Sequence, residues 1–329
     1  MELFRLDESC AMPDNHKNYL TPSNDKNVTI VEVGPRDGLQ SEAFFVPTAK
    51  KVKLIELLSQ SGLKRIETTS FVHPETIPAL KDADALLGRI QKKPGVIYSA
   101  LVPNMAGLRR ALKTTVDEIA LFLSASETHN QKNLNMSMAD SLKGFAEIAK
   151  IAKNAGRSLR GYVATAFGCI DEGHISAAQV KEIIRAYADL GVSEVVLCDT
   201  FGMANPRLTA DFFEKLFNKT TAVRLAAHFH NNRGLGLANI CAALKTGVRV
   251  FDSAIGGLGG CPTSTNAKGN VATEDLVNML EEMGFATGVN FDKLIPAYNL
   301  VKQVLAVDLP SHTYGQGRPV WQKKQAVGV

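Results

Sequence analysis

Two histidines separated by a single residue, His228 and His230, stand in the stretch "AHFH". If this stretch is a strand, both imidazoles point to the same side, because side chains alternate along a strand. We expect that side to be the inside of a barrel, since an outward pair would need buried partners beneath a layer of helices. Taken alone, such a pair is more often a pair of hydrogen-bonded core histidines than a metal site, so the metal hypothesis depends on the residues that accompany it.

An arginine and an aspartate stand side by side, Arg36 and Asp37, in "VEVGPRDGLQ", just past a run of β-formers. A carboxylate, two neutral imidazoles and an amide oxygen would form a mixed nitrogen and oxygen set. Such a set suits a six-coordinate divalent ion with positions left open for substrate. Mg²⁺ or Mn²⁺ fits best, while Zn²⁺ remains an alternative because two histidines and one carboxylate also form catalytic zinc sites.

The adjacent charges of Arg36 and Asp37 allow two interpretations. In one, they form an ion pair that merely caps the strand. In the other, the neighbouring side chains diverge, so that Asp37 turns to a metal and Arg36 turns to a ligand. Because arginine keeps its proton at working pH, Arg36 would then offer a fixed positive charge to an oxyanion.

A glycine-rich loop, "GGLGGCPTSTNAKGN", contains Cys261 and Asn270. Clustered glycines give a flexible lid and let backbone N–H groups approach an anion closely. A thiol on such a loop near a cation is placed for proton transfer, whereas the alternative is a thiol packed beneath the loop. The other cysteines lack CxxC spacing and are expected to be buried thiols; they are Cys10, Cys169, Cys198 and Cys241.

Eight runs of β-formers supply the elements that must position these side chains. They alternate with amphipathic helical stretches at roughly thirty-residue intervals, the length of one βα unit. We therefore predict an α/β fold, a (β/α)₈ TIM barrel. An open doubly wound sheet is disfavoured because the first turn lacks a GxGxxG motif. The predicted strands are 29–33, 65–68, 96–101, 118–123, 159–164, 194–198, 225–230 and 250–253.

The helical stretches carry start and stop signals. The stretch 47–62 ends at Gly62, and the stretch 176–191 begins with Ser176 as N-cap and ends at Gly191. We divide the chain into a polar N-terminal leader (1–27), the barrel (28–305) and a C-terminal tail (306–329). The tail loses helical periodicity, so we expect either a loosely packed strap or disorder.

The loops that follow the strands are where barrels of this kind place their chemistry. Several polar residues stand at such positions. Arg36 and Asp37 follow the first strand, Glu67 closes the second, Tyr162 lies near the end of the fifth, Asp199 ends the sixth, and His228 and His230 finish the seventh.

The charge and hydropathy of the chain limit the classes of partner that it is expected to bind. Among its 329 residues, Lys and Arg exceed Asp and Glu by only 37 to 33, without blocks of like charge. This balance argues against nucleic acid or an anionic membrane surface as partner. No apolar run approaches the length of a membrane span, and the polar, acid-bearing N-terminus does not look like a transit peptide, so we expect a cytoplasmic protein. A homodimer is the commonest assembly and is the expected one.

Seven motifs together resemble the 3-hydroxy-3-methylglutaryl-CoA lyase family, whose members are metal-dependent barrels. The resemblance runs from about residue 28 to about residue 294. It implies the metal ligands Asp37, His228, His230 and Asn270, the catalytic residues Arg36, Cys261, Asp199 and Glu67, and the substrate-binding residues Arg36, Tyr162 and Gln40. The motifs are "EVGPRDGLQ", "IETTSFV", "SASETHN", "RGYV", "HFH", "GLGGCP" and "GNVATEDLV".

The implied reaction is a retro-Claisen cleavage of 3-hydroxy-3-methylglutaryl-CoA, or of a close 3-hydroxy-3-alkylglutaryl-CoA homologue. The products would be acetyl-CoA and a keto acid such as acetoacetate. Cys261 would protonate the enolate, and the base would be a relay through Asp199 or Glu67. One alternative is a synthase of the same superfamily that condenses acetyl-CoA with a 2-oxoacid; the other is a non-catalytic barrel that binds metal or CoA.

Three stretches depart from the family pattern. Where the family usually has Asp-Thr-Tyr-Gly or Asp-Thr-Arg-Gly after "HFH", this chain has Asn231, Asn232, Arg233 and Gly234. The missing carboxylate is expected to alter the hydrogen bonds that orient His230. The stretches "CDTFG" and "GGCPTSTNAKGN" also differ. We expect these changes around the acyl pocket, which leaves the exact acyl group open.

Overall fold

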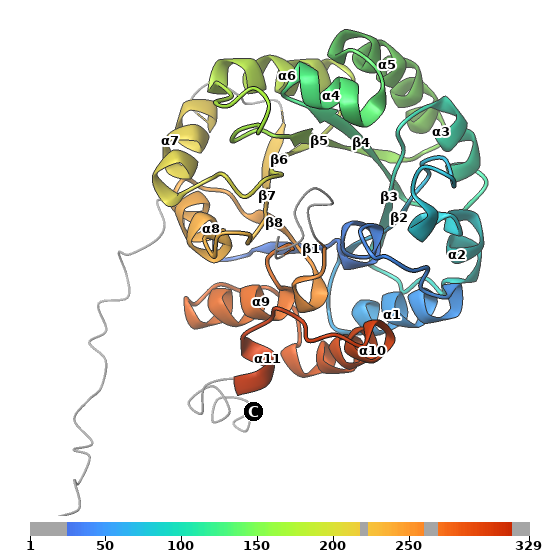
Figure 1. Cartoon of the computed structure of the whole chain (residues 1–329), viewed down its shortest axis with the longest axis vertical. Coiled ribbons are helices and arrows are strands. Elements are labelled where there is room, and N and C mark those ends of the chain that lie inside the picture. Colours follow the sequence, from blue (N-terminus) through green and yellow to red (C-terminus); the bar gives the residue numbers. More distant parts are fainter. Residues whose placement is uncertain (1–24, 218–222, 260–268, 318–329) are drawn as a thin grey trace, which may run out of the picture.

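Eight parallel strands close into a barrel in the computed structural model, which describes residues 25–217, 223–259 and 269–317. Each strand pairs with the next along the chain, and β8 pairs with β1 (Figure 1). The predicted barrel is therefore confirmed, and each predicted strand end matches the observed one or differs from it by at most two residues. The strands are β1 (Thr29–Glu32), β2 (Arg65–Ser70), β3 (Ile97–Leu101), β4 (Glu118–Ser124), β5 (Ser158–Ala164), β6 (Glu194–Asp199), β7 (Arg224–Phe229) and β8 (Val250–Ser253).

Helices surround the barrel on its outside (Figure 1). The α-helices are α1 (Thr48–Gln60), α2 (Ala83–Arg89), α3 (Met105–Ala111), α4 (Glu127–Leu134), α5 (Met138–Asn154), α6 (Ala177–Asp189), α7 (Pro206–Phe217), α8 (Gly236–Lys245), α9 (Thr273–Glu282), α10 (Ile295–Leu305) and α11 (Thr313–Gln316). Four short helical turns complete the set: the π-helical η2 (Gly34–Gly38) and the 3₁₀ turns η3 (Pro78–Leu80), η4 (Ile255–Gly257) and η5 (Phe291–Lys293).

The predicted helix signals are confirmed. Ser176 accepts the N–H of Gln179 at the start of α6, as an N-cap does. Gly62 and Gly191 have positive φ just past the ends of α1 and α6. On α1 the buried face includes Lys51, whose Nζ donates to Asp82 at 2.6 Å, rather than apolar residues alone.

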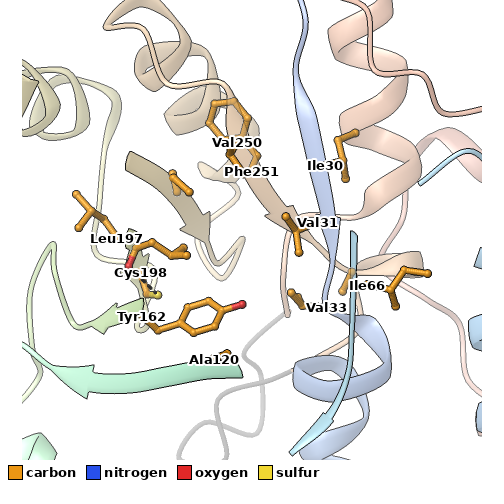
Figure 2. Packing of buried hydrophobic residues seen from close by; sticks show 14 of the residues in the cluster. Ile30, Val31, Val33, Ile66, Ala120, Tyr162, Leu197, Cys198, Val250 and Phe251 are labelled. Atoms are coloured by element: carbon orange, nitrogen blue, oxygen red, sulfur yellow. Dashed lines mark hydrogen bonds between the residues drawn. The ribbon is translucent and has the colours of Figure 1, made fainter. Parts of the chain in front are cut away.

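The interior of the barrel holds charged side chains, while the apolar core lies between strands and helices. Val31 pairs in register with Arg65 and with Asp252, so these positions face the same side of the sheet. The residues on either side of these positions face the helices, among them Ile66 and Phe251 (Figure 2).

The described part of the tail is a packed strap, which was one of the two predicted alternatives. Leu309 is buried, and the carboxylate of Asp275 accepts the N–H groups of His312 at 3.0 Å and Thr313 at 2.6 Å. Tyr314 stacks on Tyr298 with ring centroids 3.6 Å apart. The rest of the tail and most of the leader lie outside the described residues. Among the described residues, no helix combines the length and hydropathy that crossing a membrane requires.

Candidate metal centre and active site

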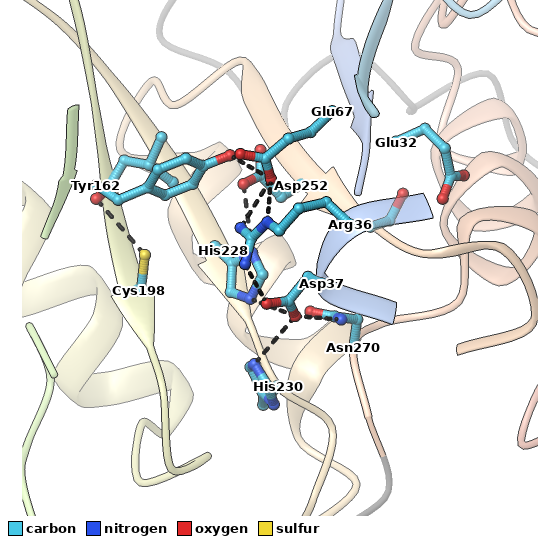
Figure 3. Close-up of polar contacts among 12 residues, drawn as sticks. Glu32, Arg36, Asp37, Glu67, Tyr162, Cys198, His228, His230, Asp252 and Asn270 are labelled. Carbon is cyan, nitrogen blue, oxygen red and sulfur yellow. Dashed lines mark hydrogen bonds and ion pairs between the residues drawn. The ribbon is translucent and has the colours of Figure 1, made fainter. Parts of the chain in front are cut away.

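Three predicted metal ligands converge at one end of the barrel. One ligand atom each from Asp37, His228 and His230 lies within 4.8 Å of the other two. The Nε2 atom of each imidazole is 4.0 Å from Oδ2 of Asp37 (Figure 3). The alternation expected of β7 explains why both histidines face this point, and η2 brings Asp37 to it from the opposite end of the chain.

Asn270, the fourth predicted ligand, completes the cluster. Its Nδ2 donates to Oδ2 of Asp37 at 2.8 Å and to the carbonyl of Leu258 at 2.9 Å. Its Oδ1 is buried and has no hydrogen-bond partner within the described residues. A buried amide oxygen without a partner, next to a carboxylate and two imidazoles, fits a divalent cation that prefers oxygen and nitrogen ligands.

The charges around the cluster favour the protonation states that a cation needs. Burial alone would raise the pKa of Asp37, but the Arg36 guanidinium and the two imidazoles hold it well below its usual value. Burial, together with repulsion from His228, lowers the pKa of His230 to about 4. Near neutral pH this centre therefore offers a carboxylate and an uncharged imidazole as ligands.

Arg36 and Asp37 do not diverge, which corrects the expectation drawn from their adjacency. Arg36 Nη1 donates to Oδ1 of Asp37 at 2.6 Å, while Nε and Nη2 both lie 2.7 Å from Oε2 of Glu67. The ion pair does more than cap the strand, however. Asp37 binds Arg36 through one oxygen and faces the two histidines with the other (Figure 3).

Glu67 and Tyr162 lie directly behind Arg36. The hydroxyl of Tyr162 donates to Oε2 of Glu67 at 3.3 Å, and the Arg36 guanidinium lies 5.7 Å from the centre of the Tyr162 ring. Burial raises the pKa of Glu67, although the nearby Arg36 opposes that rise. The Glu67 carboxylate therefore orients the guanidinium from below.

Asp199 makes no direct bond to this cluster, although the charge of His228 acts on its carboxyl. Its Oδ1 accepts the N–H groups of Met203 at 2.7 Å and Ala204 at 3.1 Å, so it caps the loop after β6. Within the described residues its Oδ2 is buried without a partner, and no hydrogen bond or ion pair joins it to the metal centre. Burial raises the pKa of Asp199 to about 6.

For two further predicted site residues, the structure gives no contact with the cluster. Gln40 follows η2 closely, but no hydrogen bond links it to the cluster in the part of the chain that the structure describes. Cys261 lies outside the described residues. Their roles stay predictions.

Two buried residues in the interior were missed by sequence reasoning. Asp252 lies 3.3 Å from Nδ1 of His228, and Arg160 donates to the same carboxylate at 2.7 Å and to the hydroxyl of Tyr162 at 2.7 Å. Asp252 thus fixes the ring that presents Nε2 to the cluster. The register between β7 and β8 pairs His228 with Asp252, and neither strand's own sequence signals that pairing.

The unusual stretch after β7 has a structural role. Asn231 Oδ1 accepts the N–H of Gly236 at 3.0 Å, and Arg233 Nη1 donates to the carbonyls of Phe201 at 2.9 Å and Gly202 at 2.6 Å. These contacts join the loops after β6 and β7. Nδ1 of His230 is buried with no partner among the described residues.

Comparison with known proteins gives consistent matches. Residues 27–301 match the family model described as HMGL-like. Hydroxymethylglutaryl-CoA lyase YngG of Bacillus subtilis is 45% identical over 87% of this chain and 96% of its own length. The mitochondrial hydroxymethylglutaryl-CoA lyase of Homo sapiens is 46% identical over 85% of this chain and 86% of its own length.

Solved structures agree with these relatives. The crystal structure of the Bacillus subtilis HMG-CoA lyase superposes with a TM-score of 0.87 at 44% identity, covering 88% of this chain and 98% of that one. An HMG-CoA lyase from Acinetobacter baumannii, in complex with coenzyme A and 3-methylmalate, superposes with a TM-score of 0.86 at 42% identity. That match covers 91% of this chain and 98% of the other.

Proposed function

The chain belongs to the HMGL-like family, and from this premise we propose that it is a carbon–carbon lyase that cleaves 3-hydroxy-3-methylglutaryl-CoA to acetyl-CoA and acetoacetate. One structural observation supports this proposal independently of the similarity to known lyases. The side chains of Asp37, His228, His230 and Asn270 meet at a single point beside the Arg36 guanidinium.

The donor set supports Mg²⁺ or Mn²⁺ as the resident ion, held by Asp37, both imidazoles and the amide oxygen of Asn270. When bound, such an ion would act as a Lewis acid that makes the tertiary hydroxyl of the substrate easier to deprotonate. Asp252 orients His228 for this task through Nδ1, and Arg36 restrains the other oxygen of Asp37.

Arg36 supplies the positive charge for the carbon–carbon scission. The hydroxyl proton leaves, the bond between the carbinol carbon and the CH₂ of the thioester arm breaks, and its electron pair forms the thioester enolate. Arg36 is proposed to stabilise the negative charge on that thioester oxygen, because Glu67 and Asp37 already fix its orientation. A proton from Cys261 on the enolate carbon would complete acetyl-CoA.

The two acidic residues divide into different proposed roles. Glu67 is engaged with Arg36 and Tyr162, so we propose it as a positioning residue. Asp199 keeps one oxygen without a partner among the described residues and has a pKa near 6, so we propose it as the proton acceptor, directly or through one water.

A substrate panel tests the function. The purified protein is incubated with 3-hydroxy-3-methylglutaryl-CoA and with homologues that vary the 3-alkyl group, with chelator and after Mg²⁺ or Mn²⁺ is restored. We expect acetyl-CoA and acetoacetate to form only with metal. Condensation of acetyl-CoA with 2-oxoacids, in place of cleavage, would identify the synthase. Retained metal with no substrate of the panel cleaved would identify the non-catalytic barrel.

Three expectations from the sequence stay predictions: the cytoplasmic location, the homodimer and the division into leader, barrel and tail. The substrate panel also identifies the preferred 3-alkyl group. That group stays open because Phe201 and Arg233 depart from the family pattern; Arg233 donates a hydrogen bond to the carbonyl of Phe201 in the loop after β6.

A further inference from the structure

The Glu32 carboxylate lies behind the metal centre, outside the barrel interior. Val31 pairs in register with Arg65 and Asp252, which fill the interior, so alternation turns Glu32 toward the helices. Figure 3 draws Glu32 apart from the cluster around Asp37, with the ribbon of the η2 turn between them. Glu32 is completely buried, and this position excludes it from contact with substrate inside the barrel.

Three donors from three separate segments converge on this carboxylate. Its Oε1 accepts the backbone N–H of Gly34 at 2.8 Å and that of Ile255 at 2.9 Å. Its Oε2 accepts the hydroxyl of Thr273 at 2.6 Å. The described residues place no positively charged group in contact with it, so all three partners are neutral.

Each of these segments carries or adjoins part of the metal centre. Gly34 begins the η2 turn that presents Arg36 and Asp37. Thr273 begins α9, three residues after Asn270. Ile255 begins η4, whose following residue Leu258 accepts a hydrogen bond from the Asn270 amide at 2.9 Å. Glu32 therefore ties the turn that carries Asp37 to the segment that runs from Asn270 into α9.

The packing at Gly34 shows how tightly this arrangement is built. A Cβ atom at this glycine would lie 2.6 Å from Oε1 of Glu32 and 3.2 Å from the Ile255 side chain. The Glu32 carboxylate can occupy this position only because Gly34 has no side chain. Adding one methyl group would push the carboxylate off its donors without removing any charge.

We propose that Glu32 is a positioning residue that holds Asp37 and Asn270 at the separation a divalent cation needs. The proposal rests on the proposed function only for its effect on turnover, because metal binding can be measured without substrate. Partners beyond the ligands of a metal commonly change its affinity by about ten- to a hundredfold when they are lost.

Mn²⁺ titration followed by electron paramagnetic resonance tests this role on the full chain. Glu32→Ala and Gly34→Ala should each weaken Mn²⁺ binding by at least about tenfold. Glu32→Gln should bind nearly as the native chain does, since its amide oxygen still accepts both N–H groups and its NH₂ donates to the Thr273 hydroxyl.

Two controls match these changes. Gly144→Ala adds the same methyl group in α5, where a Cβ meets nothing within 4 Å, and should leave Mn²⁺ affinity unchanged. Asp82→Asn neutralises a largely buried carboxylate just before α2, where it pairs with Lys51 at 2.6 Å, and should lower thermal stability without weakening Mn²⁺ binding.

Native Mn²⁺ affinity in Gly34→Ala or in Glu32→Ala would overturn the proposal and leave Glu32 a residue that serves stability alone. If Glu32→Ala fails to fold by circular dichroism, Gly34→Ala decides. With substrate, the affected variants should gain turnover on adding Mn²⁺ at concentrations that already saturate the native chain. A native chain that binds Mn²⁺ but cleaves no substrate would overturn the proposed function, while the binding comparison would still decide the role of Glu32.

Discussion

Asp37 divides its two carboxylate oxygens between two partners. Oδ1 accepts from Arg36, and Oδ2 faces His228, His230 and Asn270. The position of the proposed cation and the position of the Arg36 guanidinium are therefore coupled through a single side chain. A substitution at Arg36 is expected to alter the position of Asp37 and so the binding of the cation. A substitution among the proposed metal ligands is likewise expected to alter the position of the Arg36 guanidinium.

Replacing Arg36 tests the proposed oxyanion role. Arg36→Met should lower the turnover of 3-hydroxy-3-methylglutaryl-CoA at least about a hundredfold, because the developing enolate loses its fixed positive partner. Steady-state kinetics at saturating Mn²⁺ measures this. The same variant should lose stability, since Glu67 is left buried without its cation.

A double variant separates the two effects. Arg36→Met with Glu67→Gln removes the stranded charge, so the free energy of unfolding should recover while turnover stays low. Recovery of turnover together with stability would mean that Arg36 serves the fold and not the reaction.

The buried carboxyl of Asp199 predicts a stability that depends on pH. Its pKa is about 6 in the folded chain, above the ordinary value of 3.8, so the folded state holds the proton more tightly than the unfolded state does. The contribution of Asp199 should therefore fall as pH rises from about 4 to about 6, by up to about 1.4 kcal/mol per pH unit, and stay constant above that window.

Urea unfolding of the native chain and Asp199→Asn, at intervals from pH 4 to pH 7, checks this. The stability difference between the two should shift in favour of the variant as pH rises through the window. A difference that does not change with pH would mean that the Asp199 carboxyl titrates normally.

At the scale of elements, hydrophobic pattern and caps were enough to predict the strands and the barrel. The η2 turn was not predicted, and this explains the wrong expectation for Arg36 and Asp37. Side chains of adjacent residues diverge on a strand, but in the π-helical η2 turn the side chains of Arg36 and Asp37 bind each other. The sequence predicts that both residues follow the first strand, but it does not predict the conformation of the backbone there.

The contact between Asp252 and His228 also lay beyond the sequence. Each strand shows its own alternation, but the register between β7 and β8 depends on how the whole barrel closes. The convergence of Asp37, His228, His230 and Asn270 could be predicted because they follow strand ends and match a family motif. Their proposed supporting partners, Asp252 and Glu32, are single acids in apolar strands without any local signal.

The strap after α10 leads to a prediction about Gly256. This residue has φ +67°, and a Cβ there would lie 2.5 Å from Cδ1 of Leu309 in the strap. Gly256→Ala should lower the free energy of unfolding by about 1 to 3 kcal/mol, from backbone strain and displaced packing. Gly88→Ala in α2, with nothing within 4 Å of its Cβ, is the control and should be neutral or slightly stabilising. Urea unfolding measures both, and equal stabilities would contradict the packed strap.

At the scale of the whole molecule, composition does not reveal that charges fill the barrel. Arg160 is completely buried there and pairs with Glu194 at 2.8 Å and with Asp252 at 2.7 Å. Arg65 joins the same Glu194 at 2.7 Å. This network links the strands from the inside and extends up to the ring of His228, so the metal centre has a rigid polar base.

Metal should stabilise the whole barrel, because its ligands come from both ends of the described chain. At a free concentration of a hundred times the dissociation constant, Mn²⁺ should raise the free energy of unfolding by about 2.7 kcal/mol. Chemical denaturation with and without Mn²⁺ measures this. His230→Ala should abolish the effect, and an equal gain in that variant would place the ion elsewhere.

Closure of the barrel between β1 and β8 has a consequence for biosynthesis. Asp37 emerges from the ribosome early, but its partner Asn270 is translated more than two hundred residues later. A nascent chain that ends before β8 contains Arg36 and Asp37 but lacks Asn270, so its set of proposed metal ligands is incomplete. Unfinished or prematurely terminated copies should therefore be unable to capture the cation, and so unable to act on substrate.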